Sequence, residues 1–246
     1  MKTEKSNNAH LPYLVIGIVG VLIVIGLVWW LQNRQAAPQK AQSGALKPNI
    51  NTALASAPVG ANPPNFRGAA NSPIVLEEFA DYQCPTCAKV HPVLSQIASE
   101  YGSRIKFVYR SFPLTSIHDK SYDAAVAAEA AGLQGKFWDM QNQLFQNQGK
   151  WSSSMDHRTL FADYAKLIGL DVEKFKTDSA GLLTKSRVDA DLARASAARL
   201  SGTPSLFLNG SPIDVAQITV DRLRSIIEEE LKRFQAAQSQ GSAPQK

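Results

Sequence analysis

The sequence is poor in cysteine and in long apolar runs. Two cysteines among 246 residues exclude a disulfide-rich scaffold, which needs several bridges. A single apolar run is long enough to cross a bilayer, so a polytopic membrane protein is also excluded. With 44% hydrophobic and 19% charged residues, the chain as a whole is neither disordered nor collagen-like. These limits leave one folded domain behind a single apolar segment.

The sequence also lacks a cluster of basic residues. Its net charge of +5 comes mostly from residues 1–66, where Glu4 is the one acidic residue against five basic ones: Lys2, Lys5, Arg34, Lys40 and Lys47. The remaining residues are close to neutral, with 21 basic and 20 acidic side chains. A nucleic-acid-binding domain usually carries a clustered basic face, so we expect no nucleic-acid partner.

The one long apolar run covers residues 11–31, which hold no charge. As a helix these residues span about 30 Å, the thickness of the hydrocarbon core. A cleaved signal peptide is the alternative, but its apolar core is usually only about 7 to 15 residues long, and Trp29-Trp30 are typical of an interfacial anchor. We predict an uncleaved single-pass membrane anchor that follows a cytoplasmic tail, residues 1–10. The flanking charges do not settle its orientation.

The segment after the anchor, residues 32–66, is rich in Ala, Gln, Asn, Ser and Pro and shows no amphipathic period. This composition predicts a flexible linker with an end-to-end distance of about 30 to 35 Å. Residues 237–246 are predicted to be a disordered tail. Between these segments, residues 67–236 have the patterning of a folded domain.

The domain pattern begins after Pro73 with an apolar, β-branched strand, IVLEEFA, over residues 74–80, followed by a helix from Cys84 to about Tyr101. A second strand is predicted over residues 105–112. A helical block covers about residues 114–200. A third strand, SLFLNG, leads through an Asn-Gly turn into a hairpin, and a final helix starts near Thr219. This order predicts an α/β domain with an all-helical insertion.

The two cysteines form Cys84-Pro85-Thr86-Cys87 where a strand meets a helix. The unpaired N–H groups at a helix start stabilise a thiolate, so Cys84 should have a lowered pKa and act as the nucleophile. Cys87, about one turn on, is placed to resolve a mixed disulfide. Pro85 suits the first helical turn. Two alternatives are a structural disulfide and a zinc half-site with His91, although a second pair of ligands is not evident.

Four stretches then follow one another along the chain: EEFADYQCPTC, VHP with Pro92, GKFWDMQNQLF and SGTPSLFLNG. In this order they resemble the DsbA-like thiol-disulfide oxidoreductases, above all the membrane-anchored bacterial members. The resemblance covers about residues 66–236 and implies a thioredoxin fold with a helical insertion. It also implies a cis peptide bond between Thr203 and Pro204, facing the cysteines, with the Thr203 backbone pairing to a substrate peptide.

The resemblance further implies that Glu78 is a buried acid with a raised pKa that exchanges protons with Cys87. A solvent-facing carboxylate at a strand edge is the alternative for Glu78. Glu77, on the opposite face of the strand, is expected to be exposed. Thr86 departs from the strongest oxidants of the family, which carry histidine there, so the thiolate should be less stabilised than in those proteins.

Other residues near the motif have weaker assignments. His91 and Trp138 are expected to pack within and between helices. Asp81 and Tyr82 flank the cysteines and either shape a groove or cap the following helix, and Gln83 has no assigned role.

The sequence therefore predicts an extracytoplasmic protein thiol-disulfide oxidoreductase on a single-pass anchor in the cell membrane. A CxxC oxidant would be ineffective in a reducing cytosol. Its expected partners are exported proteins that carry cysteines, with a membrane redox partner of the DsbB or vitamin K epoxide reductase type. No metal and no cofactor beyond the Cys84–Cys87 pair are expected. A tethered reductase or isomerase, and a peptide-binding chaperone module, are the alternatives.

Overall fold

The computed structural model describes residue 30 and residues 50–241. The predicted cytoplasmic tail, nearly all of the predicted anchor and the first part of the predicted linker lie outside these residues. Among the helices that are described, none has the length and apolar character needed to cross a membrane. Residues 50–241 belong to one compact unit.

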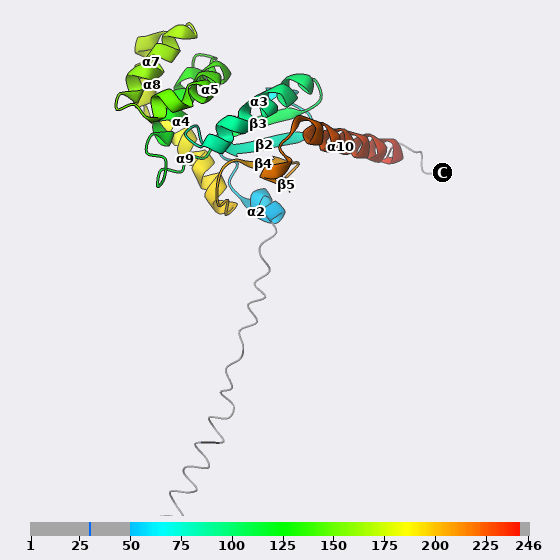
Figure 1. The fold of residues 1–246 in the computed structure, drawn as a ribbon. Helices are drawn as coiled ribbons and strands as arrows, with labels where there is room; N and C mark the ends of the chain where they lie inside the picture. Colours follow the sequence, from blue (N-terminus) through cyan, green and yellow to red (C-terminus); the bar gives the residue numbers. More distant parts are fainter. Residues whose placement is uncertain (1–29, 31–49, 242–246) are drawn as a thin grey trace, which may run out of the picture. The chain divides into compact units, whose positions relative to one another are not determined.

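A mixed sheet of five strands runs through this unit in the order β1-β3-β2-β4-β5 (Figure 1). The central strands β2 and β3 are parallel, and the other pairs are antiparallel. The strands are β1 (Asn65–Gly68), β2 (Val75–Ala80), β3 (Lys106–Ser111), β4 (Ser205–Leu208) and β5 (Ser211–Ile213). The three strands predicted from apolar runs are confirmed as β2, β3 and β4, and the Asn-Gly turn joins β4 to β5 as predicted.

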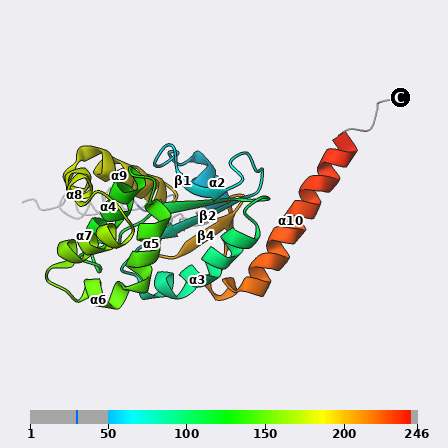
Figure 2. The ribbon, with the colours of Figure 1, turned by 90° about the horizontal axis from the view of Figure 1, so that it is seen from above.

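Helices cover both faces of the sheet (Figure 2). On one face, α3 (Pro85–Glu100) and α10 (Val220–Gly241) pack against a core that includes Leu76 of β2. On the other, α2 (Ile50–Ser56) and α9 (Leu182–Ala197) pack around Phe79 of the same strand. Because successive side chains of a strand point to opposite faces, β2, the middle strand of the sheet, supplies both cores.

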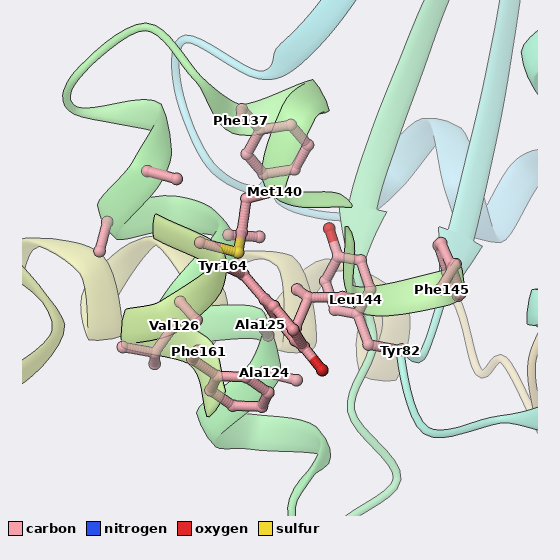
Figure 3. Close-up of a cluster of buried hydrophobic side chains, with 14 of the residues drawn as sticks. Tyr82, Ala124, Ala125, Val126, Phe137, Met140, Leu144, Phe145, Phe161 and Tyr164 are labelled. Carbon is pink, nitrogen blue, oxygen red and sulfur yellow. The ribbon is translucent and has the colours of Figure 1, made fainter. Parts of the chain in front are cut away.

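The segment between β3 and β4 is the predicted helical insertion. It consists of α4 (Ser121–Gly132), α5 (Phe137–Gln146), α6 (Gln148–Ser152), α7 (His157–Leu167), α8 (Val172–Ala180) and α9. Figure 3 shows side chains of α4, α5 and α7 packed together, with Met140 among them and Tyr82 from the cysteine loop alongside. This third core also contains Cys84 and Cys87, so the insertion packs directly against the end of the sheet that carries the cysteines.

The prediction of a flexible linker as far as residue 66 is wrong for residues 50–66. This stretch forms α2 and the first half of β1, and Leu54 and Ala61 are buried. Arg194 of the insertion donates hydrogen bonds to the carbonyls of Leu54 and Pro58. The composition of this stretch does not predict that it packs against the domain, because the carbonyls of Leu54 and Pro58 are bound by a side chain more than 100 residues away.

Two further sequence expectations are corrected. Residues 237–241 continue α10 rather than starting a disordered tail, because Ala and Gln extend a helix and no glycine or proline interrupts it before Gly241.

Glu77 is buried rather than exposed, at 8%. Its carboxylate accepts hydrogen bonds from Arg110 at 2.8 Å and Arg194 at 3.0 Å. A strand pattern cannot anticipate these partners, since Arg194 comes from the insertion.

Candidate active site

The two cysteines lie at the start of α3, where the sequence predicted them. Cys84 is the residue that caps the helix, with extended backbone angles, and Pro85 occupies the first turn. Both cysteines are free thiols; Cys84 is 7% exposed and Cys87 is fully buried. The outer thiol is therefore the one that a large protein substrate can reach, and the inner thiol is protected from solvent.

The environment of Cys84 favours its thiolate. A hydrogen bond from the Cys87 thiol is the largest cause, and the Thr203 side chain and the backbone N–H groups of Cys87 and Thr86 add to it. Together they lower the pKa of Cys84 to about 5, against the opposing effect of burial. N–H groups at a helix start have no partner within the helix, so they are free to bind the sulfur. At neutral pH the outer cysteine is thus ionised.

The environment of Cys87 has the opposite effect. Burial raises the pKa of its thiol far above the ordinary value, and the hydrogen bond to Cys84 and the charge of Glu78 act in the same direction. Cys87 therefore stays protonated at neutral pH. The pair combines an ionised nucleophile with a neutral neighbour that must lose a proton before it can attack.

The peptide bond between Thr203 and Pro204 is cis, which confirms the geometry that the resemblance implied. This bond lies at the cysteine pair, because the Cys84 sulfur is 3.4 Å from the Thr203 carbonyl oxygen, to which the protonated thiol donates a hydrogen bond. The Thr203 hydroxyl is buried and has no other partner among the described residues. Strand β4 begins at Ser205, two residues after Thr203, so the start of an extended segment lies beside the Cys84 sulfur.

Glu78 lies on β2 with 2% of its surface exposed, and its Oε1 atom has no hydrogen-bond partner within residues 50–241. Burial raises the pKa of this carboxyl to about 8, and the charge of Arg67 opposes the rise. The charge of Glu78 in turn acts on Cys87. Glu78 is therefore a buried acid whose proton is exchangeable near neutral pH, close enough to Cys87 for the two to interact electrostatically.

Arg67 is a part of this environment that the sequence did not reveal. It lies on β1, a strand that was not predicted and that crosses the predicted boundary between linker and domain. Its guanidinium stacks on Trp138 at 4.7 Å and Phe107 at 5.2 Å. Its Nη2 atom donates to Ser95 at 3.3 Å. These contacts hold the Arg67 guanidinium in place. Its positive charge limits how far the pKa of Glu78 rises.

Replacing Glu78 by glutamine should make stability less dependent on pH. The folded chain keeps the Glu78 proton up to about pH 8, whereas an unfolded chain releases it near 4.5. The free energy of unfolding therefore falls as pH rises from about 4.5 to about 8, and this loss of stability is complete above pH 8. Glu78→Gln cannot ionise, so we expect it to be more stable than the wild type at pH 8.5, by about 4 to 5 kcal/mol, and little changed at pH 4.5.

Urea unfolding of the reduced protein at the two pH values measures this difference. Glu173→Gln, at an exposed carboxylate, is the matched control and should leave the pH dependence unchanged. Equal pH dependence in Glu78→Gln and the wild type would contradict a protonated, buried Glu78.

The loop before the cysteines is held by Asp81, for which the sequence offered two roles. Its carboxylate, 1% exposed, accepts hydrogen bonds from the backbone of Gln83 and Leu114 and from His118. The Gln83 side chain in turn accepts from the backbone of Lys120 at 2.8 Å. Asp81 and Gln83 therefore join the cysteine loop to the segment that leads into the insertion.

Gln148 of α6 also secures this loop, and the sequence gave no signal for it. Its amide donates to the carbonyls of Tyr82 and Cys84, at 2.7 and 2.9 Å.

His91 and Trp138 pack as expected: the His91 ring stacks on Phe145 and bonds to Asn142. The finding that Trp138 also contacts Arg67 adds to the expected helix packing.

Comparison with known proteins agrees with this geometry. The family model for thioredoxin matches residues 61–229. Among solved structures, BdbD from Bacillus subtilis in its oxidised form has a TM-score of 0.61 and 25% identity, over 72% of this chain and 96% of that one. The thiol-disulfide exchange protein alpha-DsbA2 from Wolbachia pipientis has a TM-score of 0.57 and 22% identity, over 68% and 87% of the two chains. The latter likeness shows the fold alone.

Curated relatives share the same part of the sequence. The Na(+)/H(+) antiporter NhaA 1 of Mycolicibacterium vanbaalenii is 36% identical over 167 residues, which are 65% of this chain and 26% of that protein. The protein of the same name from Salinispora arenicola is 31% identical over 211 residues, 85% of this chain and 31% of that protein. The chain thus spans about a quarter to a third of the length of these relatives.

Proposed function

The chain belongs to the thioredoxin family, and from this premise we propose that it is a DsbA-like oxidoreductase that introduces disulfide bonds into exported proteins. The lowered pKa of Cys84 is the observation that carries the proposal. Stabilising the Cys84 thiolate stabilises the reduced form of the pair, and a couple with a stabilised reduced form is an oxidant.

The reaction starts from the Cys84–Cys87 disulfide. A substrate thiolate attacks the Cys84 sulfur, the bond between the two cysteines breaks, and Cys87 leaves as a thiolate. A second substrate thiolate then attacks the substrate sulfur of the mixed disulfide and displaces Cys84. The substrate loses two electrons and two protons, and the enzyme becomes a dithiol whose outer cysteine is ionised. The low pKa makes Cys84 a good leaving group in the second step.

Glu78 is proposed to supply the proton that Cys87 needs when it leaves. The Cys87 thiolate is unfavourable in its buried site, whereas Glu78 is protonated at neutral pH. Transfer of the Glu78 proton to Cys87 removes the unstable charge and leaves a carboxylate that Arg67 stabilises. In re-oxidation the carboxylate takes the proton back, which allows Cys87 to attack.

Substrate peptides are proposed to bind along the start of β4. The Thr203 backbone lies against the Cys84 sulfur, and an extended peptide that pairs with it would bring its own cysteine to that sulfur. Pro85 and Thr86 border the same site from the start of α3. Main-chain pairing accepts many sequences, which suits an enzyme with several clients.

The proposed location is the extracytoplasmic face of the cell membrane, with residues 11–31 as the anchor. Disulfide donation requires an oxidising compartment, and this supports the assignment. A membrane redox partner of the DsbB or vitamin K epoxide reductase type is proposed to accept the two electrons from the dithiol. The antiport activity named for the relatives is not proposed here, because the chain matches only a minor part of their length.

The direction of transfer is tested by mixing the oxidised full-length protein with a reduced, unfolded client that has two cysteines. We expect one client disulfide to form for each enzyme disulfide consumed, as counted by thiol alkylation. A reductase would instead leave this client reduced and, in its dithiol form, would reduce the disulfides of a folded client. That result would reverse the proposed direction.

A further inference from the structure

The helical insertion contains a cavity of about 350 Å³ that the cysteine chemistry does not use. Its walls come from α4, α7, α8 and α9, and neither cysteine, Glu78, Thr203 nor Pro204 lines it. Sites for small molecules typically have volumes of about 300 to 1,000 Å³. The cavity is open to solvent on one side, where Arg158 and Lys176 are exposed, so a ligand can enter it.

The floor of the cavity is apolar and partly aromatic. Val126 and Ala127 of α4, Phe161 of α7 and Phe175 of α8 form it, and each is at most 5% exposed. Val126 and Phe161 lie near one another in the core drawn in Figure 3. The Phe161 ring is fixed by an edge-on contact with Trp151 at 5.3 Å. The rings of Phe161 and Phe175 beside small aliphatic groups favour an aromatic ring as the buried part of a ligand.

The rim of the cavity is basic. Arg158, Lys176 and Lys185 lie there, with Asp123 as the one acid among the lining residues. Asp123 is already bound by Arg158 at 2.9 Å and by His157 at 2.7 Å. Lys176 makes only an exposed pair with Glu173, and Lys185 bonds to the carbonyl of Ala180 but to no carboxylate among the described residues. The two lysines therefore remain able to bind an anion.

We propose that this cavity binds a small carboxylic acid that carries an aromatic ring. The ring lies on Phe161 and Phe175, and the carboxylate faces Lys176 and Lys185. Both parts of the ligand are needed, because the apolar floor supplies most of the buried area and the rim selects the charge. The site is distinct from the peptide-binding surface beside Pro204, so its occupation does not depend on the proposed oxidase function.

Calorimetric titration of the full-length protein in lipid nanodiscs, corrected with empty nanodiscs, tests the ligand class. Three probes share a ring and a three-carbon chain: 3-phenylpropanoate, 3-phenylpropanol and 3-phenylpropylammonium. We expect the carboxylate to bind with a Kd below about 1 mM, the alcohol about fivefold more weakly and the ammonium more weakly still. Absence of carboxylate binding, or equal affinity for carboxylate and alcohol, would overturn the proposal.

Two variants locate the binding. Val126→Trp fills the floor and should abolish the heat of carboxylate binding while the circular dichroism spectrum stays that of the wild type. If this core change prevents folding, the surface pair Lys176→Glu/Lys185→Glu serves instead and should weaken binding about tenfold. Lys166→Glu/Lys174→Glu has the same net charge away from the cavity and should bind as the wild type does. Equal weakening by both double variants would refute a local site.

Discussion

A Cys84→Ser variant should lose all measurable disulfide exchange, whereas Cys87→Ser should accumulate a mixed disulfide with its client. The hydroxyl of serine is not ionised at neutral pH and cannot form a disulfide, so the first step is lost with the nucleophile. In Cys87→Ser the low pKa of Cys84 is retained in part, because the Thr203 side chain and the backbone N–H groups at the start of α3 remain. The outer sulfur can still react, but no inner thiol resolves the product.

Non-reducing electrophoresis after incubation with an oxidised client separates these outcomes. Cys87→Ser should give a covalent complex that a reductant dissolves, and Cys84→Ser should give none. Both variants should unfold at nearly the wild-type urea concentration when all proteins are reduced. A complex formed by Cys84→Ser would mean that Cys87, buried as it is, acts as the nucleophile, and the assignment of roles would be wrong.

An Asp191→Ala variant should lose about 3 to 5 kcal/mol of stability. Asp191 is fully buried and accepts hydrogen bonds from Arg110 and from the backbone N–H groups of Ala61 and Ser111. Removing the carboxylate leaves two buried N–H groups without partners and weakens the neutralisation of Arg110, which still pairs with Glu77. The free energy of unfolding in urea measures the loss.

The control is Asp189→Ala, two residues earlier on the same helix, where the carboxylate is exposed and bonds to the Tyr122 hydroxyl. Its loss should be below about 1 kcal/mol. Because Asp191 binds Ala61, the large loss should be accompanied by faster proteolysis within residues 50–66. A stability near that of the wild type would show that this buried cluster does not hold the segment against the domain.

The local features of the active site could be predicted because they depend on neighbours in the sequence. Cys84, Pro85 and Cys87 meet at a strand–helix boundary, and the N–H groups that stabilise the thiolate belong to the same few residues. The position of Thr203 beside Cys84, 119 residues away, came instead from resemblance to a family. No periodicity or spacing in the chain would have supplied it.

The features that were missed depend on contacts between distant segments. Arg67 was not considered because β1 pairs with β3, about 40 residues further along the chain, and that strand carries no strong pattern of its own. Glu77 was expected to be exposed because alternation along β2 placed it opposite Glu78. The strand is in fact covered on both faces, and Arg110 and Arg194 neutralise the charge. Alternation predicts the face of a residue but not what covers that face.

The reduction potential of the Cys84–Cys87 couple tests the central claim most directly. The protein is equilibrated in glutathione buffers of known ratio, and its thiols are counted by alkylation. A stabilised Cys84 thiolate predicts an oxidising couple, between about −120 mV and about −180 mV. A value near about −270 mV, the thioredoxin end of the scale, would contradict the account and make the chain a reductant that requires an electron donor.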